Sequence, residues 1–164
     1  MGFNGDFEAS TETWGFNGDF GKMLTVMTPG AAAIRPLNPE THGAWTRALA
    51  KAGYVIDRWH CDVDSGAFVV GLRTLSLLGL RQNPCGIIDL VRAYDQEDRA
   101  TILSILEQAT ATSSSFCFSA MVRRPSGSAY QLCCIGNSTL GAHGAGGSLQ
   151  GVFAVPRSRS ALPA

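Results

Sequence analysis

A stretch of alternating side chains near the C-terminal end restricts the fold of this chain more than any other feature. Over residues 116–123, Phe116, Phe118, Ala120 and Val122 alternate with Cys117, Ser119, Met121 and Arg123. A period of two is typical of a β-strand that buries one face. A turn at 125–127, a second strand over 129–137 and a last strand over 149–155, ended by Pro156, follow it. The sequence therefore predicts three consecutive antiparallel strands.

Helical signals occur earlier in the chain. Residues 38–53 have Asn38 as an N-cap, Pro39 at the first helical position and Gly53 as a stop. Their apolar side chains Trp45, Leu49 and Ala52 fall on one face. A longer helix is predicted from the acidic cluster at 95–98 to Ala111, with Ile102 and Leu106 on its apolar stripe.

The segment between these helices favours a hairpin followed by short helical pieces. Residues 56–64 and 67–70 have strand character and are separated by an Asp-Ser-Gly turn. Short helical pieces are expected at 73–78 and 86–91. Strands and helices that are grouped in this way predict an α+β fold and not a doubly wound parallel sheet.

Composition and charge exclude several classes of protein. The chain has 13 basic and 13 acidic residues, so no positive excess supports bulk nucleic-acid binding. No apolar run is long enough for a membrane span and no signal peptide begins the chain, so we expect a cytoplasmic protein without membrane insertion. Five cysteines without C-x-x-C spacing argue against a disulfide framework and against a metal site.

Five short motifs lie in order between residues 54 and 155. They are Trp59 with Asp62 and a Ser65-Gly66 turn, Leu78-Gly79-Leu80, Tyr94 to Arg99 (YDQEDR), Arg123 to Gly127 (RRPSG) and Leu149 to Val152 (LQGV). In order and spacing they resemble the motifs of a PAS domain. The resemblance implies a five-stranded antiparallel sheet with helices over one face. It also implies that the helix at 38–53 is an N-terminal cap helix of the kind that PAS domains use for dimer contacts.

This resemblance gives the expected domain organisation. We expect a flexible segment over 1–37, the cap helix over 38–53, the PAS domain over 54–156 and a tail over 157–164. The sequence GFNGDF occurs at residues 2–7 and again at 15–20. The aromatic residues of this segment are either incidental and solvated, or anchors for a partner or for the domain's own surface.

PAS domains hold haem, flavin, small metabolites or nothing, and the residues here argue against the first two. Haem-binding members offer a His from the long helix or just before it, and residues 80–111 contain none. Flavin photosensors need a reactive Cys in an N-C-R-F-L-Q-like stretch, whereas Cys85 follows Pro84 and lacks that context. We therefore expect no haem, flavin or other cofactor.

No catalytic constellation is present, so we expect no enzyme activity. The chain has no G-x-S-x-G elbow, no phosphate-binding G-K-[ST] and no paired histidines. The vicinal pair Cys133 and Cys134 would point to opposite faces of a strand, one into the core and one outward. A redox sensor that uses such a thiol is the weakest of the alternatives.

The resemblance to PAS domains and the lack of a catalytic constellation in the sequence together indicate a regulatory, sensory function in signal transduction. The chain is similar to bacterial single-domain PAS proteins, so we expect a homodimer that regulates a partner, such as a histidine kinase, through protein–protein interaction. The candidate interface residues are Trp45, Leu49, Arg123 and Arg124. The alternative is a sensor of a small, mostly apolar ligand. The candidate pocket residues for that ligand are Ile102, Leu106, Phe116, Phe118 and Ala120, which equally suit a filled core.

Overall fold

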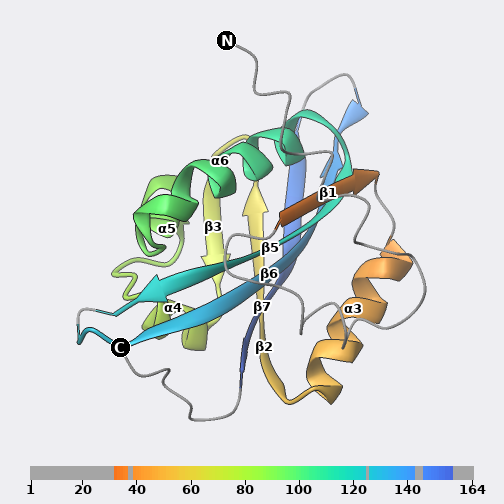
Figure 1. Ribbon diagram of the computed structural model, residues 1–164. Coiled ribbons are helices and arrows are strands. Elements are labelled where there is room, and N and C mark those ends of the chain that lie inside the picture. Colours follow the sequence, from red (N-terminus) through yellow and green to blue (C-terminus); the bar gives the residue numbers. More distant parts are fainter. Residues whose placement is uncertain (1–31, 37–38, 125, 143–145, 157–164) are drawn as a thin grey trace.

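The computed structural model describes residues 32–36, 39–124, 126–142 and 146–156 (Figure 1). The strands are β1 (Ala32–Pro36), β2 (Tyr54–Asp62), β3 (Ala67–Val70), β4 (Cys85–Gly86), β5 (Ser114–Arg123), β6 (Ala129–Leu140) and β7 (Gly147–Pro156). The helices are α3 (Pro39–Lys51), α4 (Leu72–Leu77), α5 (Ile87–Arg92) and α6 (Gln96–Ala111). No helix among these residues is long and apolar enough to cross a bilayer.

The strands form one antiparallel sheet in the order β1-β5-β6-β7-β2-β3-β4. The α+β prediction is confirmed. The five strands expected from the sequence occupy the middle of the sheet, and β1 and the two-residue β4 extend its two edges. The described sheet thus has seven strands and not five.

The sequence predicted a flexible segment over residues 1–37, but residues 32–36 of it form strand β1. Its register runs from Ala32 opposite Phe118 to Pro36 opposite Ser114. The two alanines that begin β1 have low strand propensity. Backbone pairing with β5 therefore holds a segment that lacks a strand pattern of its own. The two GFNGDF copies and the tail at 157–164 lie outside the described residues.

One face of the sheet packs against α4, α5 and α6 and holds the larger core. Trp59 is central to it, with its ring centroid 5.6 Å from that of Phe68 and 5.8 Å from that of Phe153. Gly136 of β6 lies beneath these rings, and a Cβ atom there would overlap Phe116 and Trp59. The missing side chain thus lets the aromatic cluster lie directly on the sheet.

The opposite face is covered by α3, the helix that the sequence predicted as an N-terminal cap. Leu49 is fully buried in a second cluster, and Trp45 is half-buried against it. The other buried members of this cluster are Cys117, Cys133, Ile135, Val152 and Ala154. The apolar face of α3 therefore packs on the sheet of its own chain. Leu49, expected at an interface, is not available to a second copy.

Candidate functional site

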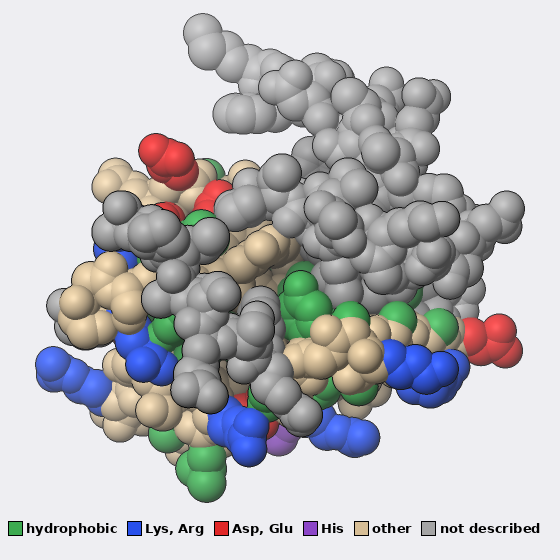
Figure 2. Space-filling model, turned by 60° about the horizontal axis from the view of Figure 1, so that its bottom comes forward, with side chains coloured by type: hydrophobic (Ala, Val, Ile, Leu, Met, Phe, Trp, Pro, Cys, Tyr) green, Lys and Arg blue, Asp and Glu red, His purple; other side chains and the backbone are tan. Residues whose placement is uncertain are grey.

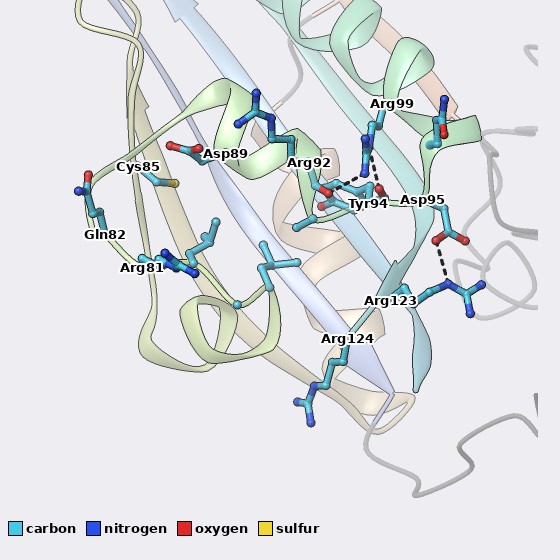
Figure 3. Close-up of a pocket in the computed structure, with 15 residues that line it drawn as sticks. Arg81, Gln82, Cys85, Asp89, Arg92, Tyr94, Asp95, Arg99, Arg123 and Arg124 are labelled. Atoms are coloured by element: carbon cyan, nitrogen blue, oxygen red, sulfur yellow. Dashed lines mark hydrogen bonds and ion pairs between the residues drawn. The ribbon is translucent and has the colours of Figure 1, made fainter. Parts of the chain in front are cut away.

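A surface recess of about 690 Å³ lies beside the inner core, at the end of β5. Its walls come from the α4–β4 connection, α5, the start of α6 and β5 (Figure 3). The floor includes Leu78, Leu80 and Ala93. Volumes of this order are usual for binding sites in proteins, which makes the recess the candidate site.

Arginines surround the recess. Its lining includes Arg81, Arg92, Arg99, Arg123 and Arg124, and the only acidic residues of that lining are Asp89 and Asp95. The formal excess is three positive charges. The recess therefore favours an acidic partner or ligand.

The turn between α5 and α6 is fixed by Arg99. Its Nε donates to the carbonyl of Tyr94 and its Nη2 to the carbonyl of Arg92, both at 2.9 Å. Carbonyls at a helix C-terminus lack intrahelical partners, and a guanidinium can serve two of them at once. Arg99 thus closes the end of α5 and holds one wall of the recess.

The start of α6 is tied to the end of β5. The backbone N–H of Asp95 donates to the carbonyl of Met121 at 3.0 Å, and the N–H of Met121 donates to Asp98 Oδ2 at 3.3 Å. An isolated bridge joins Tyr94 to Val122. These contacts place the YDQEDR motif against the strand that carries Arg123.

Two arginines of β5 and its following turn have partners that leave them accessible. Arg123 Nε lies 3.5 Å from Asp95 Oδ1, with 61% of its side chain exposed. The guanidinium of Arg124 lies 4.9 Å from the centre of the Tyr130 ring, which is a cation–π distance. Exposed ion pairs are weak, so Arg123 can exchange Asp95 for another carboxylate.

Arg81 and Arg92 complete the rim. Both are exposed, and no hydrogen bond or ion pair engages their side chains among the described residues. In Figure 2 basic side chains stand apart from one another on the face that includes α4, with apolar groups between them. Figure 3 shows the arginines of the lining on different sides of the recess, so their charge is not concentrated at one point.

Tyr94 separates the recess from the core. It lines the recess, yet the residue is only 1% exposed and its ring meets Phe118 edge-on at 6.0 Å. Its hydroxyl has no hydrogen-bond partner among the described residues. Burial, followed by the nearby thiols of Cys134 and Cys133, raises the pKa of Tyr94 well above its usual value. The phenol is therefore a neutral part of the wall.

The structure does not place the predicted pocket residues at the recess. Every one of them is buried in the larger core, and none lines the recess: Ile102, Leu106, Phe116, Phe118 and Ala120. These side chains pack in the core, which is the alternative that the sequence left open for them. The polar rim also differs from the mostly apolar pocket that the sequence suggested. Of the predicted interface residues, Arg123 and Arg124 are on the rim, while Trp45 and Leu49 are on the other face of the sheet.

The thiols are buried, and none of the five cysteines forms a disulfide. Cys133 and Cys134 point to opposite faces of β6 as predicted, but the expectation that one faces outward was wrong because α3 covers Cys133. Burial raises the pKa of Cys133 to about 12 and that of Cys61 to about 11. Thiols with raised pKa values are poor nucleophiles at neutral pH, so the geometry gives no support to a redox sensor. Within the described ranges no cluster of His, Cys, Asp or Glu could hold a metal ion.

The sequence did not single out Arg81, Arg92 or Arg99 as rim residues. They follow α4, end α5 and lie in the first turns of α6, and these elements meet at one edge only in the folded chain. The signal that could have found them is an arginine close to one terminus of each successive helix.

Comparison with solved structures shows which fold this is. The N-terminal PAS/PAC sensor domain of a diguanylate cyclase from Marinobacter aquaeolei matches 60% of this chain and 93% of its own, with a TM-score of 0.52 and 16% identity. A domain of a histidine kinase from Haloarcula marismortui, described as light and redox sensing, matches 69% of this chain and 97% of its own, with a TM-score of 0.50 and 18% identity. No family model matches the sequence, and a search of curated proteins finds no match. The chain therefore has a PAS fold, as its motifs predicted.

Proposed function

We propose that this PAS-fold domain is a non-catalytic signalling module that regulates a partner protein, such as a component of a histidine kinase network, by direct binding. Support comes from the shared fold with sensor domains of a diguanylate cyclase and a histidine kinase. The observation that carries the proposal is the arginine-rimmed recess, which opens at the surface beside the packed core.

Charge reversal at the rim tests this function. The double variant Arg123→Glu/Arg124→Glu changes two exposed side chains of the recess, whereas Arg47→Glu changes an exposed side chain on α3, on the other face of the sheet. The chain of residues 1–164 is used to capture partners from its native cells, and the captured proteins are identified by mass spectrometry. We expect at least a tenfold loss of one kinase-network protein with the double variant and no loss with Arg47→Glu. The purified pair should then show altered phosphorylation of that partner.

Native mass spectrometry of the freshly purified chain, beside a denatured sample, separates this function from ligand sensing. We expect a native mass of twice the chain mass with nothing added, which corresponds to a dimer without a bound ligand. An added mass that disappears on denaturation would favour a sensor of a small ligand. Equal capture by wild-type and double-variant protein would exclude the recess as the partner site.

A further inference from the structure

The rim arginines of the recess do not converge on one point. In Figure 3 Arg81 stands on the α4–β4 connection, Arg92 on α5, and Arg123 and Arg124 at the end of β5, each on a different side. A compact anion is bound by donors that meet at a single place. Charges spread around an apolar floor instead match an extended acidic peptide that carries an apolar side chain.

The chain itself contains a peptide of this chemistry. Residues 2–20 include Asp6, Glu8, Glu12 and Asp19 and no Lys or Arg. Within them the sequence Phe-Asn-Gly-Asp-Phe occurs twice, so that each copy sets one carboxylate between aromatic residues. A carboxylate suits the arginine rim, and a phenyl ring suits the floor of Leu78, Leu80 and Ala93.

Strand β1 begins opposite the middle of β5, the strand that ends at the recess. It pairs with β5 in antiparallel register, with Ala32 opposite Phe118 and Pro36 opposite Ser114. Ala32 is therefore the end of β1 nearer to Arg123. Arg123 lies five residue steps beyond Phe118 along β5, which corresponds to about 17 Å at the rise of an antiparallel strand.

The length of chain between the second GFNGDF copy and β1 is sufficient to cover this distance. Residues 21–31 connect them, and eleven residues reach at most about 36–40 Å when extended. A short tether of this kind gives an effective concentration on the order of millimolar, so even weak binding would occupy the recess.

We propose that the recess binds residues Gly15–Phe20 of its own chain, with Asp19 as the carboxylate that meets the arginine rim. The segment then competes with the acidic partner for the recess of its own chain. This regulatory consequence rests on the function proposed above. Binding depends on charge, so it weakens as salt screens the arginines.

A spin label next to the second copy tests the proposal in the full chain. Lys22→Cys carries a nitroxide, and a brief reaction labels it selectively because the native cysteines are buried. We expect paramagnetic broadening of the backbone amide signals of residues 80–82 and 92–93. Asp19→Lys, or Arg81→Glu with Arg92→Glu, should reduce that broadening at least fivefold. Asp6→Lys and Arg47→Glu are matched controls that should leave it unchanged.

Two outcomes would overturn the proposal. One is broadening that is absent from the recess or insensitive to Asp19→Lys. The other is broadening in a mixture of spin-labelled chain and unlabelled ¹⁵N chain, which would assign the segment to the recess of a second copy. Neither readout uses a partner protein. Loss of partner capture in Arg123→Glu/Arg124→Glu, with no effect of Asp19→Lys on the broadening, would therefore leave the proposed function standing and remove only this inference.

Discussion

The carboxylate of Asp57 accepts two hydrogen bonds from Thr74, one from its backbone N–H and one from its hydroxyl, both at 2.8 Å. Thr74 is the third residue of α4, and the N-cap position, Gly71, has no side chain to serve this turn. A residue of β2 thus caps a helix that follows β3. The cap joins the sheet to the helix that leads into the recess.

We expect Asp57→Ala to destabilise the fold. Loss of the cap should lower the free energy of unfolding by about 1–2 kcal/mol, as for other N-cap replacements. Urea denaturation followed by circular dichroism measures this. The control Glu107→Ala alters an exposed residue of α6 and should stay within about 0.5 kcal/mol of wild type. Equal stability of Asp57→Ala and wild type would show that the cap contributes nothing.

Gly71 should not tolerate a side chain. A Cβ atom at this position would overlap the carboxylate of Asp57. We expect Gly71→Ala to lower the free energy of unfolding by about 1–3 kcal/mol, the usual cost of overpacking. Because the clash involves Asp57, the double variant Gly71→Ala/Asp57→Ala should lose less than the sum of the two single variants.

A glycine in α3 offers the matched comparison. A Cβ atom at Gly43 would meet only the flexible end of Arg47, at 3.3 Å. Gly43→Ala should therefore raise stability by about 0.5–1 kcal/mol, because alanine is the better helix former. The clash with Asp57 would be contradicted if the losses of Gly71→Ala and Asp57→Ala simply add in the double variant while Gly43→Ala behaves as expected.

Arg99→Lys tests whether the guanidinium closes the end of α5. Lysine keeps the charge but cannot present two parallel donors to the carbonyls of Arg92 and Tyr94. We expect a loss of about 1–2 kcal/mol in the free energy of unfolding and faster amide hydrogen exchange in residues 90–94. The control is Arg92→Lys, whose side chain has no partner among the described residues and whose exchange pattern should match wild type. Unchanged exchange in Arg99→Lys would show that the backbone alone fixes this turn.

The sequence predicted the central strands well because their signals are local. The alternation from Phe116 to Val122 sets these side chains on the inner face, and the structure buries them there. The predicted hairpin strand over 67–70 coincides with β3, and the helix over 38–53 with α3 to within two residues at each end. These elements carry their own periodicity and end signals, so they need no tertiary information.

The features that the sequence missed depend on contacts between distant segments. Strand β1 exists through its pairing with β5, and Cys133 is buried through the placement of α3 on the outer face. The recess draws its arginines from four parts of the chain. Periodicity cannot reveal which element ends meet, so the candidate site was found only in the fold, apart from Arg123 and Arg124.

The thiol of Cys133 gives the fold a specific response to alkaline pH. Burial raises its pKa to about 12, whereas a cysteine in the unfolded chain titrates near pH ~8.5. The buried thiol therefore contributes its full stability below pH ~8.5, and that contribution is lost as the pH rises toward the folded value. Each pH unit in this window should cost up to about 1.4 kcal/mol for this one group.

We therefore expect Cys133→Ala to lose less stability than wild type between about pH 9 and pH 11, with the difference growing as the pH rises. Urea denaturation at a series of pH values measures both proteins. Cys133 also helps to raise the pKa values of Tyr54, Tyr94 and Cys134, so the difference between the two proteins reports Cys133 together with its coupling to these three groups. A native thiol titration at pH 8 should show no fast-reacting cysteine, and all five should react after unfolding. A fast native thiol, or parallel pH profiles for the two proteins, would contradict the burial of Cys133 beneath α3.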